Sequence, residues 1–340
     1  MPVTMQPATM RLCASVVAGT AAFAAGYALA YARAQRNKRR HHRGWVDAIG
    51  FEAYRDELAV AVDLAVQCGD NMLQTLGAVA TMKEAAGDIS GESIDPVTAT
   101  DIENERLCFE TLSKAFPSHV VVGEETASSS GTLPIRSNKH TWIVDPIDGT
   151  QNFCHGAPLS VVSIGLQVDG TPAMGVVYDP FRDEMYVGVA AEGAYMNGTR
   201  MRSDGCKSLA KAIVCTDVGY ERSPGGIKNI SSTIAALLKE NTFAVRIVGS
   251  TCLQVVWVAC GRVSAFYSGL GQRDCPKPWD WCAVSAIAKA CGVTCLRLDS
   301  DEPFSVETPS TVWGSTPELA HQLRGMIRTA CPSLSARDER

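Results

Sequence analysis

Apolar residues recur at helical spacing in the segment that follows residue 50. The series runs over residues 51–76 and ends at Gly77, so it predicts a helix. A second helix is expected from Thr100, as its N-cap, to residue 116, because Pro117 follows. Two polar segments near these helices are predicted to be loops, residues 87–96 and 126–139.

Strand patterns dominate the middle of the chain, as short apolar runs bounded by turn-forming residues. They predict strands over residues 120–122, 159–168, 173–178, 185–189, 212–215, 245–248 and 265–267. Helical spacing returns at residues 230–238, 253–260, 281–290 and 317–330. Helices and strands that mix in this way predict a layered α/β fold with antiparallel character in the middle.

The composition is that of an ordinary globular protein, with 46% hydrophobic and 20% charged residues in a chain of 340. This length suffices for one large domain or two smaller ones. The 13 cysteines are scattered without CxxC or zinc-site spacing, which indicates reduced thiols in a cytosol-like compartment. We expect most of them, such as Cys252, Cys260 and Cys291, to be small core residues.

The charge is distributed unevenly along the chain. The first 44 residues hold seven basic residues, and the first acidic residue is Asp47. The remainder carries 24 basic and 36 acidic residues, a formal charge of −12. An acidic body argues against nucleic acid as a partner and is compatible with a site in which carboxylates hold cations.

The N-terminal region is predicted to be a leader over residues 1–44, followed by a catalytic domain over residues 45–340. Residues 12–31 form an uncharged run close to the ~20 residues that cross a bilayer. Since the basic cluster over residues 33–43 follows this run, we expect a membrane anchor with the body on the cytosolic side. A cytoplasmic protein and a mitochondrial targeting segment are the alternatives, and the late basic cluster disfavours a secretory signal.

The stretch Trp142-Ile143-Val144-Asp145-Pro146-Ile147-Asp148-Gly149-Thr150 carries the strongest chemical signal. An apolar run brings Asp145 and Asp148 to the end of a strand, where Pro146 and Gly149 shape a tight turn. Two converging carboxylates repel unless a proton or cation lies between them, and hard oxygen ligands suit Mg²⁺. The alternative is a strand followed by an ordinary Asp-rich turn.

Four further segments place acids or hydroxyls at the ends of predicted elements. They contain Asp101, the pair Glu124-Glu125, the pair Ser250-Thr251, and Asp280 between two tryptophans. Taken singly, Asp101 and Asp280 could be helix N-caps, and the glutamates could belong to a solvated turn.

In this order, the segments resemble those of the inositol monophosphatase family of Mg²⁺-dependent, lithium-sensitive phosphatases. The resemblance covers residues 45–330 and implies an α/β sandwich with layers αβαβα, usually homodimeric. It rests on residues 97–101, 123–125, 142–153 and 279–280.

The resemblance also implies roles for individual residues. Glu124, Asp145 and the carbonyl of Ile147 would hold a first Mg²⁺, and Asp145, Asp148 and Asp280 a second. Asp101 and Glu124 would help to hold a weaker third ion. Thr150, hydrogen-bonded to Asp101, would orient the attacking water, while Glu124 also belongs to the catalytic group. The expected phosphate contacts are Gly149, Thr150, Ser250 and Thr251, and Lys83 would lie near the site in a closing flap.

The chain departs from the family pattern in two places. Gln151 stands where another Thr is common, and Ser268 where the family places an acid that binds inositol hydroxyls. An insert over residues 269–278 follows, and its Asp274 could replace that acid.

We therefore expect a phosphomonoesterase that acts on a small polyol phosphate, first of all myo-inositol 1-phosphate. The alternatives are adenosine 3′,5′-bisphosphate, histidinol phosphate or a sugar phosphate as substrate, or an inactive membrane-tethered scaffold.

Overall fold

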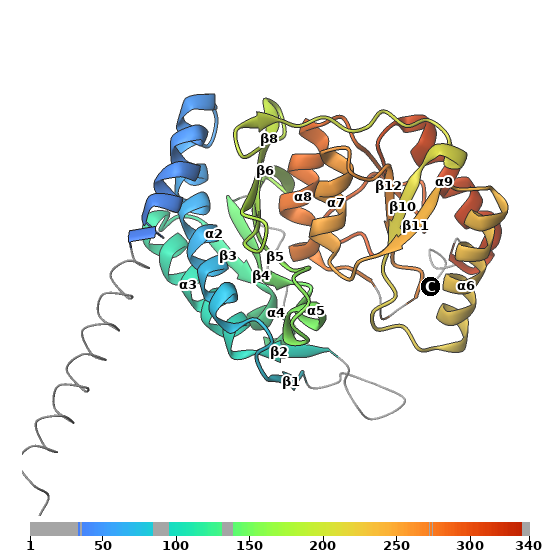
Figure 1. Ribbon diagram of the computed structural model, residues 1–340, viewed down its shortest axis with the longest axis horizontal. Coiled ribbons are helices and arrows are strands. Elements are labelled where there is room, and N and C mark those ends of the chain that lie inside the picture. The colour runs from blue at the N-terminus through green and yellow to red at the C-terminus, as the bar shows by residue number, and fades with distance from the viewer. Residues whose placement is uncertain are drawn as a thin grey trace, which may run out of the picture.

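The computed structural model describes residues 33–34, 36–83, 95–130, 139–271, 273 and 275–334. These residues form alternating layers of helices and sheets that follow one another across Figure 1. The αβαβα sandwich expected from the sequence is therefore confirmed.

The first sheet has seven strands, of which the first two are parallel and all later neighbours antiparallel. In spatial order they are β3 (Val120–Gly123), β4 (Thr141–Asp148), β5 (Val161–Val168), β6 (Thr171–Asp179), β7 (Glu184–Val189), β8 (Gly193–Met196) and β9 (Thr199–Arg200). Every residue of β4 is buried, so this strand carries its side chains into the interior.

The second sheet has five strands, and its middle strand is parallel to the neighbour on one side and antiparallel to the neighbour on the other. In spatial order they are β11 (Ala244–Ile247), β10 (Ile213–Thr216), β12 (Ala265–Ser268), β14 (Thr311–Gly314) and β13 (Thr294–Arg297). A separate hairpin consists of β1 (Ala80–Met82) and β2 (Pro96–Thr98).

Pairs of helices form the three helical layers. The outer face of the first sheet is covered by α2 (Arg55–Thr75) and α3 (Ala99–Ala115), and α7 (Thr251–Ala259) and α8 (Pro278–Ala290) lie between the sheets. The second sheet is covered by α6 (Pro224–Lys239) and α9 (Pro317–Ala330), as Figure 1 shows. Short connections include α4 (Glu124–Ser130), α5 (Thr150–Cys154) and the 3-10 turn η1 (Leu209–Lys211).

A row of glycines fixes the distance between α8 and the first sheet. Gly165, Gly175 and Gly188 lie opposite one another across β5, β6 and β7. A Cβ atom at Gly175 would come within 2.2 Å of the carbonyl oxygen of Ala283 in α8. Only glycine permits such an approach, so this row sets the position of Asp280 in the first turn of the same helix.

Most predicted helices and strands are confirmed, but two local predictions are wrong. Helix α3 takes Thr98 rather than Thr100 as its N-cap, because Thr98 and Asp101 form a capping box. The loop expected over residues 126–139 begins as α4, since Glu105 accepts hydrogen bonds from the first amides of that helix. Residues 131–138, and 87–94 of the other predicted loop, lie outside the described residues.

Residues 36–49 form a helix that contacts the rest of the protein through residues that precede the expected domain boundary at residue 45. His42 is buried, and its Nε2 lies 2.9 Å from Asp183 Oδ1, while Lys38 Nζ lies 3.3 Å from the same atom. Within the part of the chain that the structure describes, the helices are too short or too polar to span a bilayer. The apolar run over residues 12–31 lies outside that part.

Candidate active site

The end of β4 carries the two aspartates that the sequence predicts as metal ligands. In a regular strand, Asp145 and Asp148 would face opposite sides, because side chains alternate. The pairing with β5 shifts between them: Asp145 lies opposite Ser163 and Asp148 opposite Val161. This bulge inserts one residue and brings both carboxylates to the same side.

Asp280, in the first turn of α8, completes a cluster with Asp145 and Asp148. One carboxylate oxygen from each of the three residues lies within 4.8 Å of the others. Burial and the charges of neighbouring carboxylates raise the pKa of all three carboxyls, that of Asp148 to about 7. Asp145 and Asp148 are buried and Asp280 is half-buried, and carboxylates at this spacing favour a bound cation. Hard oxygen donors suit Mg²⁺.

Asp148 is held by the start of α7. The Ser250 hydroxyl donates to Asp148 Oδ2, and the backbone N–H of Cys252 donates to the same oxygen at 2.9 Å. The N–H of Thr251 donates to Asp148 Oδ1 at 3.2 Å. The structure therefore places Ser250 and Thr251, which we expected to contact phosphate, directly on a carboxylate of the cluster.

Asp101 and Thr150 lie beside this cluster, as the sequence predicts. Asp101 is fully buried and accepts hydrogen bonds from Thr98 N at 2.8 Å and from the Thr98 hydroxyl. Burial raises the pKa of Asp101 to about 6 although these hydrogen bonds oppose the shift. The Thr150 Oγ1 atom lies 3.3 Å from Asp101 Oδ1 and 2.9 Å from the carbonyl oxygen of Ile147.

Glu124 begins α4, next to the end of β4, because β3 and β4 are parallel and adjacent. The carboxylate of Glu105, from α3, holds this helix start by accepting hydrogen bonds from Glu125 N at 2.7 Å and Thr126 N at 2.9 Å. A Cβ atom at Gly123 would come within 2.4 Å of Glu105 Oε2, so the contact requires glycine there. Sequence analysis did not predict the role of Glu105.

Lys83 places its ammonium group among the acids. Its Nζ lies 2.6 Å from Glu124 Oε1 and 3.1 Å from Glu125 Oε1. Burial lowers the pKa of Lys83, but the charges of Glu124, Asp95 and Glu125 outweigh this effect and raise it overall. Burial and the charge of Glu124 raise the pKa of Glu125 to about 8. In this structure the Glu124 carboxylate is therefore paired with a positive charge, the ammonium group of Lys83.

Sequence analysis also missed Asp217 and Tyr220, which follow β10. Asp217 Oδ1 accepts hydrogen bonds from Gly249 N at 2.8 Å and Gln254 Nε2 at 2.7 Å. Burial raises the pKa of Asp95, and a hydrogen bond from Tyr220 opposes this rise. Asp217 follows an apolar strand directly, and this position could have marked it as a candidate, although its hydrogen-bond partners lie in a distant segment.

Ser268 is the last residue of β12 and is buried opposite Thr311 of β14. Its hydroxyl oxygen is buried without a hydrogen-bond partner among the described residues. Asp274, which we expected as a possible substitute for the missing acid, lies outside the described residues.

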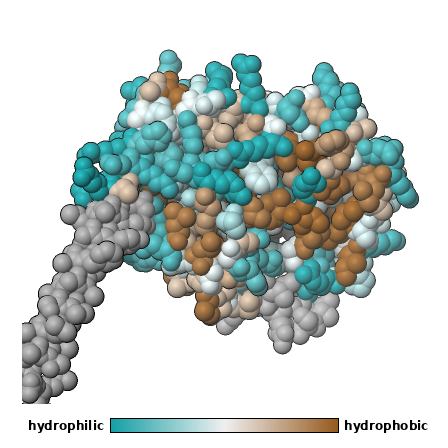
Figure 2. Space-filling view, in the orientation of Figure 1, coloured by the Kyte–Doolittle hydropathy of each residue, from teal (hydrophilic) through white to brown (hydrophobic). Residues whose placement is uncertain are grey.

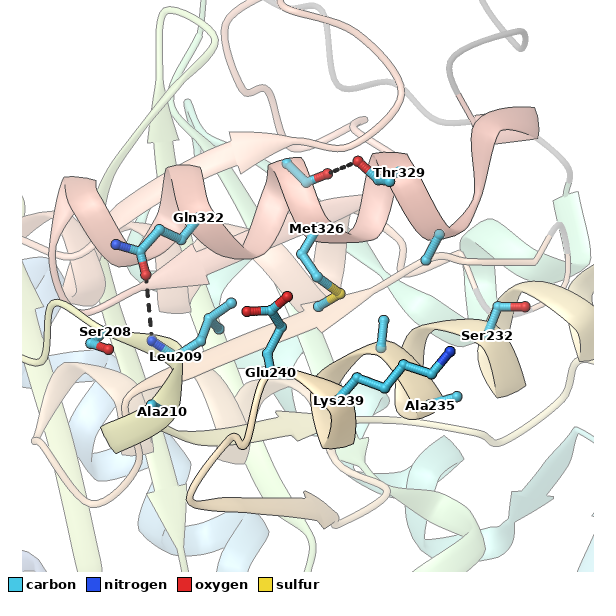
Figure 3. A pocket seen from close by; sticks show the side chains of 13 residues that line it. Ser208, Leu209, Ala210, Ser232, Ala235, Lys239, Glu240, Gln322, Met326 and Thr329 are labelled. Carbon is cyan, nitrogen blue, oxygen red and sulfur yellow. Dashed lines mark hydrogen bonds between the residues drawn. The ribbon is translucent and has the colours of Figure 1, made fainter.

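A groove of about 790 Å³ lies elsewhere, between η1, α6 and α9 (Figure 3). Its charged groups are Lys239 and Glu240, and its wall includes the hydrogen bond from Leu209 N to Gln322 Oε1 at 3.4 Å. The carboxylates of Asp145, Asp148 and Asp280 are not among its lining residues. We therefore place the candidate active site at Asp145, Asp148 and Asp280.

Comparison with known proteins agrees with this geometry. The model of the inositol monophosphatase family matches residues 54–330. The chain belongs to the inositol monophosphatase family. This confirms the resemblance on which the site assignment was built.

Individual relatives of the family cover most of the chain. Inositol monophosphatase 1 of Solanum lycopersicum is 38% identical over 236 residues, which are 69% of this chain and 82% of the relative. Inositol monophosphatase 2 of Homo sapiens is 34% identical over 283 residues, 83% of this chain and 94% of the relative. The solved structure of inositol monophosphatase from Anabaena has a TM-score of 0.66 at 28% identity and covers 83% of this chain and 98% of its own.

The inositol monophosphatase assignment makes this chain a phosphatase that hydrolyses phosphate monoesters. The cluster of carboxylate oxygens provides donors that suit a metal-dependent phosphatase.

Proposed function

We propose that the chain hydrolyses a small polyol phosphate with the help of Mg²⁺, and that myo-inositol 1-phosphate is its substrate. The observation that carries the proposal is the carboxylate cluster of Asp145, Asp148 and Asp280, with the Thr150–Asp101 pair beside it. A buried acid cluster attracts divalent cations, and the adjacent hydroxyl and carboxylate can orient a water molecule.

The metal ligands are proposed as follows. Glu124, Asp145 and the carbonyl of Ile147 hold a first ion, and Asp145, Asp148 and Asp280 hold a second. Asp101 and Glu124 contribute to a weaker third. The short contact between Lys83 and Glu124 supports this assignment, because it shows that Glu124 favours a positive charge beside it. Bound Mg²⁺ would supply the positive charge that stabilises the phosphoryl and leaving-group oxygens in the transition state.

The chain's own groups bind and orient the reactants. The Thr150 hydroxyl accepts a hydrogen bond from the attacking water and donates one to Asp101. The proton that the water loses therefore passes through Thr150 Oγ1 to the Asp101 carboxylate. The N–H groups of Gly149 and Thr150 face the phosphate. Gly149 has a φ of 90°, which favours glycine and turns the backbone toward the cluster. We assign Ser250 and Thr251 the role of holding Asp148, because the Ser250 hydroxyl and the Thr251 N–H both donate hydrogen bonds to its carboxylate.

Phosphate release from purified protein tests the proposal. We expect release from myo-inositol 1-phosphate with Mg²⁺, loss of release with a chelator, and inhibition by millimolar lithium. The substrate panel also contains adenosine 3′,5′-bisphosphate, histidinol phosphate and sugar phosphates. Release that persists in chelator would contradict the metal assignment, and preference for another ester would replace the substrate while leaving the phosphatase chemistry in place.

A second substrate class has support from one observation. Ser268 stands at the end of β12 where the family resemblance leads us to expect an acid, and its side chain is buried. A short buried hydroxyl does not replace a carboxylate that binds several substrate hydroxyls. A nucleotide, histidinol phosphate or sugar phosphate is therefore the alternative substrate.

We also propose that the leader anchors the protein to a membrane, with the body on the cytosolic side. The support is the order of the apolar run and the basic cluster in the sequence. Cell fractionation of the full chain, beside a chain that begins at residue 33, tests this. We expect only the full chain in the membrane fraction, whereas its presence in mitochondria would favour the targeting alternative.

A further inference from the structure

The helix over residues 36–49 packs against the body of the protein through one of its faces. His42 Nε2 lies 2.9 Å from Asp183 Oδ1, and Lys38 Nζ lies 3.3 Å from the same oxygen. The indole N–H of Trp45 donates a hydrogen bond to His42 Nδ1 at 3.3 Å. Lys38, His42 and Trp45 stand three or four positions apart, so they share one side of the helix. These contacts hold the helix in a fixed position on the body.

The opposite side of the same helix carries a row of arginines. Arg33, Arg36 and Arg40 are exposed and have helical backbone, and they too stand three and four positions apart. Arg40 precedes the inward-facing His42 by two positions, a rotation of about 200° around the helix axis. At a rise of about 1.5 Å per residue, the row is about 10 Å long. We call Arg33, Arg36 and Arg40 the arginine ridge.

The ridge differs in charge from the body that carries it. The first 44 residues hold seven basic residues, and the first acidic residue is Asp47. Arg43, one turn beyond the ridge, pairs with Asp63 of α2 at 2.9 Å. Residues 45–340, in contrast, have a formal charge of −12. A nucleic acid that extends along this body would be repelled, whereas a flat anionic surface meets only the side of the protein that faces it.

The position of the ridge in the chain indicates which anionic surface it meets. The apolar run over residues 12–31 ends two positions before Arg33. A run of this length that crosses a bilayer leaves the residues that follow it at the level of the lipid headgroups. We propose that the arginine ridge binds the anionic headgroups of a phospholipid bilayer. The inference deepens the proposed membrane anchor and rests on it for the place of the ridge.

The chemistry of the ridge fits this partner. A guanidinium group donates two parallel hydrogen bonds to phosphate or carboxylate oxygens, the acceptors that anionic headgroups offer. Three arginines alone bind such a surface weakly, but a basic patch next to an apolar segment gives stable attachment. Because Lys38 and His42 hold the helix on the body, contact of the ridge with the headgroups also fixes how the body is oriented at the bilayer.

The test measures how the full chain partitions onto two kinds of vesicle, phosphatidylcholine alone and phosphatidylcholine mixed with phosphatidylserine. The apolar run contributes equally to both partition coefficients, so its effect cancels in their ratio. We expect the mixed vesicles to be favoured about 100-fold or more at low salt, since each arginine contributes about 5-fold. At about 1 M salt, where the Debye length is about 3 Å, the ratio should approach unity.

The triple substitution Arg33→Gln, Arg36→Gln and Arg40→Gln should lower the ratio at low salt roughly 100-fold. It leaves the buried contacts of the helix in place, so the melting temperature should match that of the wild type. The matched control is Lys211→Gln, Lys228→Gln and Lys239→Gln, which removes three exposed positive charges from η1 and α6. This control should keep the wild-type ratio.

A wild-type ratio near unity, a ratio that does not respond to salt, or an equal loss in the lysine control would overturn the inference and leave the proposed anchor standing. Binding to the mixed vesicles without binding to phosphatidylcholine would support the ridge and remove the anchor. Tighter binding to duplex DNA than to the mixed vesicles, lost in the arginine variant, would assign the ridge to nucleic acid instead. Phosphate release is measured separately, so the proposed catalysis does not depend on any of these results.

Discussion

Asp145 and Asp148 are buried, and Asp280 is half-buried, at a cost in folding free energy. A carboxyl whose pKa is raised in the folded state favours the protonated form, so its ionisation at neutral pH destabilises the fold. Hydrogen bonds from Ser250 and from the start of α7 offset part of that cost for Asp148. A bound cation offsets more, and binding of the cation is thereby coupled to the stability of the fold.

Substitution Asp145→Asn tests this coupling at one residue. We expect activity to fall about 10³-fold or more, because the bridging ligand of both proposed ions is lost. Without metal, the melting temperature should stay the same or rise by a few degrees, since one buried charge is removed. The gain in melting temperature on adding Mg²⁺, measured by calorimetry, should be smaller than in the wild type.

Asp169→Asn is the control for this substitution, because Asp169 lies in the exposed β5–β6 turn with a φ of 48° that Asn tolerates. An Asp145→Asn protein that keeps most of its turnover would disprove the bridging role.

Local sequence patterns identified the acids of the cluster because each follows or begins an element. Asp145 and Asp148 belong to one short motif, and Asp280 follows a Pro and a Trp at a helix start. Glu105, Asp217 and Tyr220 could not be assigned in this way, since their contacts depend on the path of loops between distant segments. Asp217, for example, bonds to Gly249, 32 residues further along the chain. The capping role of Thr98 was missed because Thr100 offered an equally good local signal.

At the scale of elements, Glu105 connects α3 with the start of α4 and thereby sets Glu124. Glu105→Ala removes the acceptor for the amides of Glu125 and Thr126. We expect a loss of about 1–3 kcal/mol in the free energy of unfolding. The Mg²⁺ concentration for half-maximal activity should rise several-fold, because Glu124 is no longer held in place.

Glu103→Ala provides the comparison, since Glu103 is on the same helix but exposed and paired with Arg106. A Glu105→Ala protein with an unchanged Mg²⁺ requirement would show that Glu124 does not depend on this contact.

Helix α8 depends on the glycine row in a similar way. Gly175→Ala puts a methyl group 2.2 Å from the Ala283 carbonyl oxygen, so the helix must move away from the sheet. We expect destabilisation of about 1–3 kcal/mol or more, together with reduced activity because Asp280 moves with α8. Chemical denaturation and turnover measure the two effects.

Gly225→Ala tests the same chemical change in α6, where a Cβ atom meets nothing within 4 Å. We expect it to keep wild-type stability and turnover. If Gly175→Ala behaved in the same way, the close packing of α8 would not set the position of Asp280.

At the scale of the whole molecule, apolar side chains are exposed in one region near the second sheet. Figure 2 shows apolar surface gathered on the right-hand half of this face, where Figure 1 places β11 and α6. The exposed residues there include Phe243, at 71% exposure, with Leu238 and Ile247. β11 is also an edge strand, and such strands are usually covered by another element or another chain.

We propose that a second copy of this chain covers the apolar surface, which gives the homodimer expected from the family resemblance. A twofold axis places the same patch on both sides of an interface, so one apolar strand suffices for self-association. Phe243→Asp introduces two charges at the centre of that interface. We therefore expect light scattering to give a mass near 36.3 kDa for the variant and twice that mass for the wild type.

Val79→Asp is the control that distinguishes this surface from a second exposed apolar region, since Val79 is 90% exposed just before β1. It should remain dimeric, whereas a monomeric Val79→Asp beside a dimeric Phe243→Asp would assign the interface to the region of β1. The acids of the candidate active site come from α3, α4, β4 and α8, and β11 contributes none of them. A monomeric Phe243→Asp protein should therefore keep its metal requirement, which distinguishes loss of the dimer from loss of the fold.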